Sequence, residues 1–244
     1  MRIQRIYTEQ PLQSGQQINL EEDSSHHLFH VLRLQSGDSI ALFNNQGGEF
    51  SATLSEISKH GASAAIGELI REESSPKLAI QLMLGISRGE RMDFALQKAT
   101  ELGVTRITPV FTKRCVVKLN EKKRASRMAH WRKIIINACE QSGRGLLPEL
   151  DSPVEIGSAV STQTAHTALL LDHRSNKTLA EIKKPKGTIC ILVGPEGGLS
   201  SEERKLAKGQ GYTGIKLGPR IMRTETAPLA AIAAIQVLWG DFTE

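Results

Sequence analysis

Two short segments of the chain place glycine, proline and charged residues where a buried strand would end. The segments "ILVGPEGG" (191–198) and "IKLGPR" (215–220) each run from apolar residues into a Gly-Pro pair. Glycine and proline favour a turn there that bulkier residues would resist. A single corner of this kind is usually only a tight turn. Two of them, one carrying Glu196 and the other followed by Arg223 and Glu225, indicate a binding pocket.

The two corners are typical of a site that holds its ligand through the protein backbone. Loops rich in glycine and proline have few side chains, so backbone groups make the contacts. That suits an adenosine ring, whose edge resembles a hydrogen-bonding amide. No G-x-G-x-x-G opens a helix after a strand, which weakens a classical NAD or Rossmann methyltransferase assignment. No G-x-x-x-x-G-K-[ST] occurs either, which excludes a P-loop NTPase.

Charge is distributed unevenly along the chain. Residues 1–75 carry five Lys or Arg against ten Asp or Glu, whereas residues 76–244 carry 26 against 16. The densest basic stretch, 113–133, has nine Lys or Arg and only Glu121 opposing them. Such a stretch is often a solvated helix face. A cluster this dense also attracts a phosphate backbone, so nucleic acid is a candidate partner.

The elements that must position these residues change in pattern near residue 75. Up to there, short segments separated by turns predict a small β-barrel-like domain with one helix at 24–34, for which Ser24 is a plausible N-cap. Beyond it, apolar strands alternate with helices, which predicts a mostly parallel α/β sheet covered on both faces. We expect strands at 78–86, 104–111, 166–172, 188–194 and 213–218, and helices at 91–103, 127–143, 201–209 and 227–242.

Local signals set some of the helix limits. Ser200 and Glu203 have the spacing of a capping box, so the helix at 201–209 should begin there. Gly103 should end the helix at 91–103. The inward side of that helix is predicted to hold Phe94, Ala95 and Leu102.

The composition favours an ordinary globular protein of the cytoplasm. The chain has 244 residues, 39% of them hydrophobic and 23% charged. No apolar run approaches the ~20 residues of a membrane helix, and the first ten residues lack the apolar core of a signal peptide. Cys115, Cys139 and Cys190 offer neither a disulfide framework nor paired zinc ligands. We therefore expect no membrane span and no metal.

Four longer motifs resemble one known family. They are "SRGERMDFALQKATELGV" (87–104), "ACEQSGR" (138–144), "LVGPEGGLSSEE" (192–203) and "LGPRIMRTETA" (217–227). Together they closely resemble the bacterial 16S ribosomal RNA uracil-N3 methyltransferases of the SPOUT superfamily, over essentially the whole chain.

The resemblance implies a fold, a cofactor and partners. The fold would be α/β, with a PUA-like β-barrel at residues 1–72 that binds RNA and a SPOUT methyltransferase domain with a trefoil knot at residues 73–244. The methyl donor would be S-adenosylmethionine, and the substrate 16S rRNA or the small ribosomal subunit. The protein would act as a homodimer.

Carried over residue by residue, the resemblance places the donor site on the two Gly-Pro corners and one neighbouring strand end. Most of these residues would act through main-chain groups, while Leu171 and Met222 would contact the adenine. The residues are Leu171, Gly194, Glu196, Gly197, Leu217, Gly218, Ile221, Met222, Arg223, Thr226 and Ala227.

The implied reaction moves a methyl group from a sulfonium cation to a ring nitrogen that carries a proton at neutral pH. The enzyme must align the two centres and stabilise the uracil anion that forms as N3 loses its proton. Arg88 and Arg223 are the candidates for a guanidinium that stabilises this anion. Glu140 and Glu225 are the candidates for taking the proton or orienting the arginine. A structural ion pair is the alternative role for each of them.

RNA contacts are expected on two surfaces. The candidates in the basic stretch are Lys113, Arg114, Lys122, Lys123 and Arg124. The N-terminal domain is acidic overall, and its cationic candidates are Arg2, Arg5, Arg33 and the histidines at 26–30. The alternative is that this domain mainly braces the dimer.

Two other classes of function stay open at this point. A non-catalytic RNA-binding or assembly factor would explain the basic stretch but not the two Gly-Pro corners. A small-molecule enzyme with a nucleotide cofactor would explain the corners but not the nine cations in 113–133. Cofactor binding by calorimetry separates the first class from a methyltransferase. The salt dependence of RNA affinity separates the second.

Overall fold

The computed structural model describes residues 3–117 and 120–243, and the chain folds as two compact units. The first unit consists of the residues up to Ser75 together with Ile136–Leu147, and the second of Pro76–Ile135 and the residues from Pro148 onward. The domain limits expected from the sequence, 1–72 and 73–244, leave the segment 136–147 out of the first unit. The boundary between the units falls inside one helix, α3 (Glu121–Ser142).

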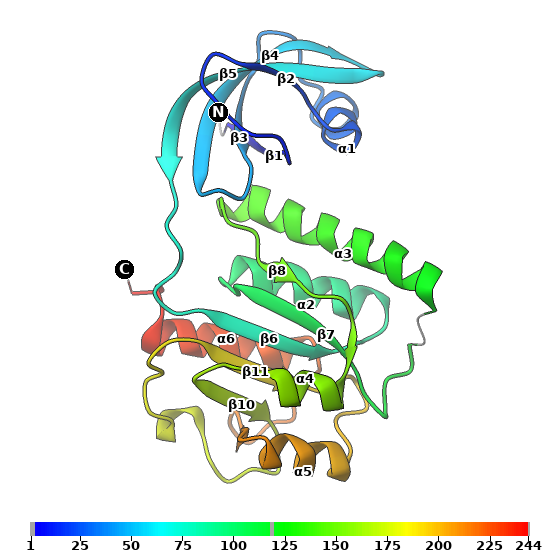
Figure 1. Ribbon diagram of the computed structural model, residues 1–244, viewed down its shortest axis with the longest axis vertical. Helices are drawn as coiled ribbons and strands as arrows, with labels where there is room; N and C mark the ends of the chain where they lie inside the picture. The colour runs from blue at the N-terminus through cyan, green and yellow to red at the C-terminus, as the bar shows by residue number, and fades with distance from the viewer. Residues whose placement is uncertain (1–2, 118–119, 244) are drawn as a thin grey trace. The chain divides into compact units, whose positions relative to one another are not determined.

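The first unit is built on a mixed five-stranded sheet (Figure 1). Its order is β1-β3-β4-β5-β2, in which β1 runs parallel to β3 and the other pairs are antiparallel. The alternating apolar side chains of β3 and β4 face one core together with Leu28. The strands are β1 (Gln4–Tyr7), β2 (Gln17–Asn19), β3 (Ser39–Phe43), β4 (Gly48–Ser58) and β5 (Gly61–Glu72).

The helix of this unit differs from the prediction. The helix α1 (Glu22–His26) begins two residues before Ser24, and a single π-helical turn, η1 (His27–Val31), follows it. Glu21 occupies the N-cap position and makes no side-chain cap hydrogen bond. The assignment of Ser24 as the N-cap was therefore wrong. Its hydroxyl instead donates to the carbonyl oxygen of Tyr7 at 3.5 Å.

The second unit contains a seven-stranded sheet, as the alternation of strands and helices predicts. Its order is β12-β10-β11-β6-β7-β8, with β9 also paired to β7, and every described pairing in it is parallel. The strands are β6 (Ile80–Gly85), β7 (Arg106–Phe111), β8 (Glu149–Leu150), β9 (Val154–Glu155), β10 (Thr167–Leu171), β11 (Ile189–Val193) and β12 (Thr213–Ile215). The two-residue strands β8 and β9 were not predicted.

Helices cover both faces of this sheet (Figure 1). On one face, α4 (Ile156–Thr162) and α5 (Ser201–Gly209) bury apolar side chains against β7, β10 and β11. On the other face, α2 (Gly89–Glu101) packs against α6 (Thr226–Trp239). A short 3-10 helix, η2 (Leu179–Glu181), lies between β10 and β11 in the chain. The fold thereby leaves the loops at the carboxyl ends of the strands free to build a site.

Two predicted helix ends are confirmed and one predicted core residue is wrong. The capping box forms at the start of α5, where Ser200 Oγ accepts from the N–H of Glu203. Gly103 follows α2 with a φ of +86°, a conformation that glycine adopts without strain. Phe94 was expected to face inward, but its side chain is 46% exposed, whereas Ala95 is buried.

Within the described part of the chain, no helix is both long enough and apolar enough to cross a membrane. The mostly apolar α6 has 14 residues.

Candidate active site

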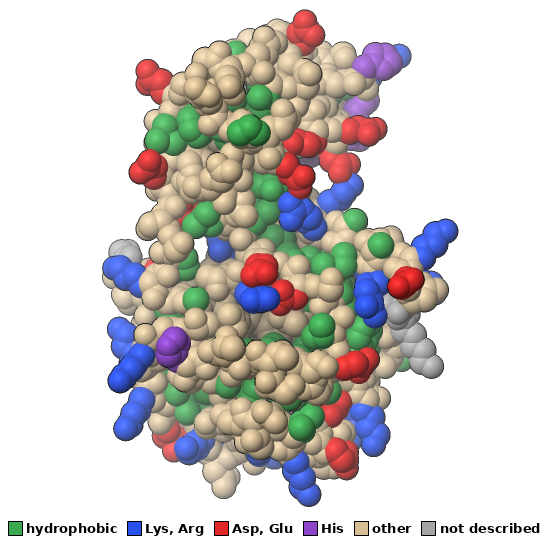
Figure 2. Space-filling model, in the orientation of Figure 1, with side chains coloured by type: hydrophobic (Ala, Val, Ile, Leu, Met, Phe, Trp, Pro, Cys, Tyr) green, Lys and Arg blue, Asp and Glu red, His purple; other side chains and the backbone are tan. Residues whose placement is uncertain are grey.

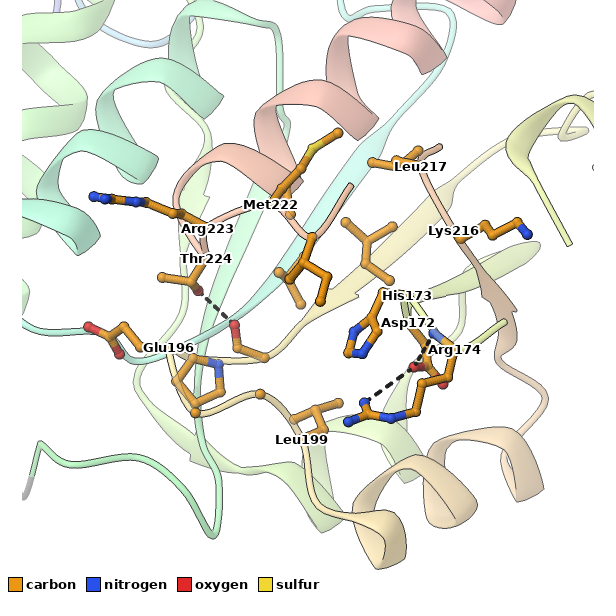
Figure 3. A pocket seen from close by; sticks show the side chains of 18 of the residues that line it. Asp172, His173, Arg174, Glu196, Leu199, Lys216, Leu217, Met222, Arg223 and Thr224 are labelled. Atoms are coloured by element: carbon orange, nitrogen blue, oxygen red, sulfur yellow. Dashed lines mark hydrogen bonds and ion pairs between the residues drawn. The ribbon is translucent and has the colours of Figure 1, made fainter. Parts of the chain in front are cut away.

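The loops after β10, β11 and β12 surround one cavity of about 460 Å³ (Figure 3). β10 lies between β11 and β12 in the sheet, so their parallel ends bring these loops to the same edge. A cavity of this size falls in the range of small-molecule and cofactor sites. The two Gly-Pro corners thus meet at one site, as their positions after strands predicted.

Close backbone approaches hold the loops around the cavity in place. A Cβ atom added to Gly85, at the end of β6, would overlap the backbone nitrogen of Pro195. One added to Gly194 would come within 2.9 Å of the backbone nitrogen of Leu199, closer than real Cβ atoms come. The hydroxyl of Thr224 donates to the carbonyl oxygen of Gly194 at 2.7 Å (Figure 3). Together these contacts hold the loops after β6, β11 and β12 against one another.

Most residues carried over by resemblance line this cavity. They are Leu171, Gly194, Glu196, Gly197, Leu217, Gly218, Ile221, Met222, Arg223 and Ala227, and the proposed proton acceptor Glu225 is among the lining residues as well. Thr226 is not in the lining set; it is the first residue of α6 and is exposed. Arg88 and Glu140 are not in it either.

The carboxylate of Glu196 ties the cavity to the start of α2. Its Oε1 accepts from the backbone N–H of Arg88 at 3.0 Å and lies 3.5 Å from Nη1 of Arg91. Partial burial works to raise the pKa of Glu196, but the hydrogen bond from Arg88 and the charge of Arg91 bring it below its ordinary value. Glu196 is therefore ionised at neutral pH. Arg88 contributes its backbone here, and its side chain is exposed.

Glu225 lines the cavity, and one of its carboxylate oxygens, Oε2, is buried without a hydrogen-bond partner among the described residues. Glu225 occupies the N-cap position of α6 without making a side-chain cap bond. A buried carboxylate oxygen without a partner is costly, so a ligand that supplies a hydrogen bond or a positive charge there would be favoured. Arg223, two residues earlier, lies on the same side of the cavity as Glu196 (Figure 3). In Figure 3 its guanidinium points away from Met222 and His173.

A cationic cluster around Asp172 was missed by sequence reasoning. The Asp172 carboxylate is buried and lies 3.7–3.9 Å from the cationic nitrogens of Arg174, Arg204 and Lys208. These residues come from the loop after β10 and from α5, so nothing in their sequence separation indicates that they meet. The strand end "LLLDHR" was the available signal, and only Leu171 was taken from it.

The cavity wall is cationic overall. Of the described residues, seven Lys or Arg and three Asp or Glu line it. A wall with this balance raises the local concentration of anions.

Glu140 lies in the first unit, where a structural contact engages it. Its Oε1 accepts from the backbone N–H of Tyr7 at 3.0 Å. Burial raises the pKa of Glu140 to about 6, against the hydrogen bond from Tyr7 and the charge of Arg5, which lower it. The geometry gives Glu140 a place in the packing of the end of α3, and its catalytic role stays a prediction.

The raised pKa of Glu140 makes stability depend on pH. A carboxyl whose folded-state pKa is raised contributes stability that is fully present below its unfolded pKa, near 4.5, and is lost as the pH rises through about 6. Relative to Glu140→Gln, the free energy of unfolding of the parent protein should therefore fall by about 2 kcal/mol between pH 4 and pH 7. Urea unfolding of both proteins across this range measures the difference. A difference that does not change with pH would contradict the assignment.

Some of the proposed RNA-contacting residues are exposed to solvent, and others bind other residues of the protein. Lys122 and Lys123 are exposed near the start of α3, where Lys and Arg side chains gather on the surface (Figure 2). Lys113 and Arg33 are also exposed. The guanidinium of Arg124 lies 5.6 Å from the ring centroid of Phe111, a cation–π contact. Arg2 lies outside the described residues.

Arg5 and Arg114 are engaged with the protein itself. The side chain of Arg5 is 9% exposed and donates to the Glu49 carboxylate and to the carbonyl oxygens of Cys139 and Arg144. Arg5 thus binds the end of α3 within the first unit, and its guanidinium is used in these contacts instead of being free for a phosphate. Nη1 of Arg114 donates to the carbonyl oxygen of Gly197 at 2.9 Å, which places Arg114 in the cavity wall.

Across the described residues, no group of three or more His, Cys, Asp or Glu gathers as metal ligands would. Cys115, Cys139 and Cys190 are free thiols.

Comparison with known families identifies the class of this protein. Residues 73–236 match the family described as RNA methyltransferase domain, and residues 20–67 match the RNA methyltransferase PUA domain. The first match spans most of the unit with the cavity, and the second lies within the first unit. Both matches point to an RNA methyltransferase with a PUA domain.

Similar proteins extend over the full length of the chain. The ribosomal RNA small subunit methyltransferase E of Buchnera aphidicola from Schizaphis graminum is 36% identical over 99% of both chains. A Legionella pneumophila methyltransferase solved with bound S-adenosylmethionine is 38% identical over 99% of this chain and 100% of its own, with a TM-score of 0.96. The Neisseria gonorrhoeae ribosomal RNA small subunit methyltransferase E, also bound to S-adenosylmethionine, is 40% identical over the same shares, with a TM-score of 0.89. The chain belongs to the ribosomal RNA small subunit methyltransferase E family.

Proposed function

We propose that this protein methylates N3 of one uridine in the RNA of the small ribosomal subunit, with S-adenosylmethionine as the methyl donor. The observation that carries the proposal is the cavity formed by the loops after β10, β11 and β12, in a chain that superposes on a donor-bound relative over 99% of its length. We assign residues 73–244 to the methyltransferase domain, with a trefoil knot, and residues 1–72 to the PUA-like domain. We propose that it acts in the cytoplasm on ribosomal RNA of the small subunit.

The residues of the cavity fit S-adenosylmethionine. Gly194, Gly197 and Gly218 line the cavity without side chains that would fill it, while Leu171 and Met222 supply apolar surface. Glu225 lines the cavity as well, and its Oε2 has no hydrogen-bond partner among the described residues. When bound, the donor supplies an electrophilic methyl group on sulfur.

The chain's own residues handle the proton and the charge on the base. Uracil N3 carries a proton at neutral pH, so forming the N3–CH3 bond requires that this proton leave. Arg223 lines the cavity and is placed to stabilise the anion on a uracil oxygen. Glu225, two residues later, is placed to accept the proton, because its Oε2 is unengaged. Glu196 holds the start of α2 and the loop after β11 together, and it stays ionised.

Nucleoside analysis in cells tests the reaction and its position. A strain that lacks this gene should lack N3-methyluridine in its small-subunit RNA, and the parent gene on a plasmid should restore it. If the deletion strain kept its N3-methyluridine and lost a different methylated nucleoside, the methyltransferase assignment would stand and the N3 position would be wrong.

Phosphate contacts of the basic stretch make RNA affinity depend on salt. Changing both Lys122 and Lys123 to alanine should weaken binding to small-subunit RNA and lower the slope of log K against log salt by about 1.5, because each lost contact removes about 0.7–0.9. The pair Lys183 and Lys184, exposed in the loop after η2, is the matched control. Filter binding from low to high salt measures the slopes. Equal slopes for the two double variants would remove the start of α3 from the RNA surface.

We propose that the protein is a homodimer held through the α2–α6 face. Val237 and Leu238 of α6 and Phe94 of α2 are 55%, 51% and 46% exposed, although they are apolar. An exposed apolar face on two packed helices is typical of a subunit interface. Light scattering should give a dimeric mass for the parent protein and a monomeric one for Leu238→Asp. A monomeric parent protein would reject the dimer.

A further inference from the structure

Two hydrogen bonds tie the segment after β7 to the corner after β11. Nη1 of Arg114 donates to the carbonyl oxygen of Gly197 at 2.9 Å, and the backbone N–H of Lys113 donates to Oε1 of Glu203 at 2.7 Å. Gly197 belongs to the proposed donor site, and Lys113 begins the basic stretch. The contact therefore joins the two surfaces that the proposed function assigns to different ligands.

The packing at this contact is tight. A Cβ atom added to Gly197 would lie 2.9 Å from the Cβ of Arg114, so the two backbones approach as closely as glycine allows. Glu203 is buried, and its Oε2 accepts from the backbone N–H of Ser200 at 2.7 Å. Glu203 thus holds Lys113 through one oxygen and the start of α5 through the other. The segment at 112–114 and the corner at 197–203 are thus joined by two hydrogen bonds.

One partner of this hydrogen bond, Gly197, lies in the proposed cofactor site, and the other, Arg114, lies in the proposed RNA-binding stretch. The peptide of Gly197 lies in the cavity wall, so an adenosyl group bound there orders the acceptor of the Arg114 hydrogen bond. On the other side, the chain continues from Arg114 into α3, which carries Lys122 and Lys123. Ordering Arg114 lowers the entropy that RNA binding must remove from this segment.

We propose that Arg114 is a positioning residue that couples cofactor binding to RNA binding through its hydrogen bond to Gly197, instead of contacting a phosphate. This inference rests on the proposed function, since it requires both ligands. Bound cofactor raises the affinity for RNA, and linkage requires that RNA raise the affinity for the cofactor by the same factor. A coupling of about 5-fold or more is expected from the usual range of such effects.

Substitutions at Arg114 separate its charge from its hydrogen bond. Arg114→Lys keeps the positive charge but loses the planar guanidinium that reaches Gly197, and Arg114→Gln loses both. The probes are S-adenosylhomocysteine, which cannot react, and small ribosomal subunits from cells that lack this gene. Calorimetry gives the dissociation constant of S-adenosylhomocysteine with and without subunits, and their ratio is the coupling factor.

The parent protein should bind S-adenosylhomocysteine about 5-fold or more tightly when subunits are present. Both Arg114 variants should bring this ratio below about twofold, and Arg114→Lys should keep its affinity for subunits without the cofactor. The Lys122→Ala, Lys123→Ala double variant should bind subunits more weakly and, at saturating subunits, keep the parent ratio. A merely structural Arg114 would lower cofactor affinity equally with and without subunits, leaving the ratio unchanged.

The outcomes distinguish this inference from the proposed function. If the parent protein binds both ligands and the ratio is 1, or if the Arg114 variants keep the parent ratio, the coupling is overturned and the methyltransferase assignment stands. If the folded parent protein binds no S-adenosylhomocysteine or no subunits, the proposed function fails, and the coupling fails with it.

Discussion

Replacing Arg223 with alanine should lower kcat by about two to three orders of magnitude and leave the affinity for S-adenosylmethionine within a few fold of the parent value. The reason is that a guanidinium fixed beside a developing anion contributes chiefly in the transition state, and loss of one such group typically has this size of effect. Single-turnover methylation of small subunits measures the rate, and calorimetry measures cofactor binding.

Arg220→Ala is the matched comparison for Arg223→Ala. Arg220 comes from the same loop, is exposed and lines the same cavity, so its removal takes away the same charge. It should cost far less in kcat, because the proposed mechanism assigns the uracil anion to Arg223 and no role to Arg220. Equal losses for the two variants would show that the arginines act through net charge alone, and Arg223 would lose its specific role.

Gly85→Ala should weaken binding of S-adenosylmethionine more than Gly194→Ala or Gly209→Ala does, because the backbone of the loop after β11 must move to make room. The added Cβ would overlap the backbone nitrogen of Pro195 and push the loop after β11 away from β6. Calorimetry measures the affinity, and circular dichroism establishes whether the variant is folded.

Two further glycine variants serve as comparisons for Gly85→Ala, and both should have smaller effects on cofactor affinity. Gly194→Ala brings its Cβ to 2.9 Å from the backbone nitrogen of Leu199 and should weaken binding less. Gly209→Ala, at the end of α5, meets nothing within 4 Å and should bind as the parent protein does. A folded Gly85→Ala protein with parent affinity would show that the close approach of β6 and Pro195 does not shape the donor site.

Local signals in the sequence predicted those elements whose limits depend on local physics. The capping box of Ser200 and Glu203 sets the start of α5, and the φ of +86° at Gly103 follows the end of α2. The strands after residue 76 were predicted because a parallel sheet covered on both faces needs continuous apolar runs. Short strands such as β8 and β9 have no such run, since two residues give no periodicity.

The errors in the fold have tertiary causes. Ser24 has the side chain of an N-cap residue, but α1 begins two residues earlier. The Ser24 hydroxyl instead donates to the carbonyl oxygen of Tyr7 in strand β1. Phe94 fits an apolar periodicity, but its side of α2 is exposed beside α6. Helical periodicity identifies an apolar face and does not indicate whether this chain or a second copy of it covers that face.

The site was predicted where glycine and proline mark it and missed where it depends on side chains from distant segments. The two Gly-Pro corners end neighbouring strands, so their meeting follows from parallel topology. The ion cluster of Asp172 with Arg204 and Lys208 joins the loop after β10 to α5, and no sequence spacing predicts it. Arg114 was recognised only by its charge, although in the structure its guanidinium binds Gly197.

Methylation of isolated subunits tests the central claim most directly. Small ribosomal subunits from cells that lack this gene are incubated with the protein and S-adenosylmethionine tritiated in the methyl group, and the 16S RNA is digested to nucleosides. Our account predicts label in N3-methyluridine at a single site, and a loss of about two to three orders of magnitude in its rate of appearance with Arg223→Ala. No label in subunits or in free 16S RNA, from a protein that binds the cofactor, would contradict it.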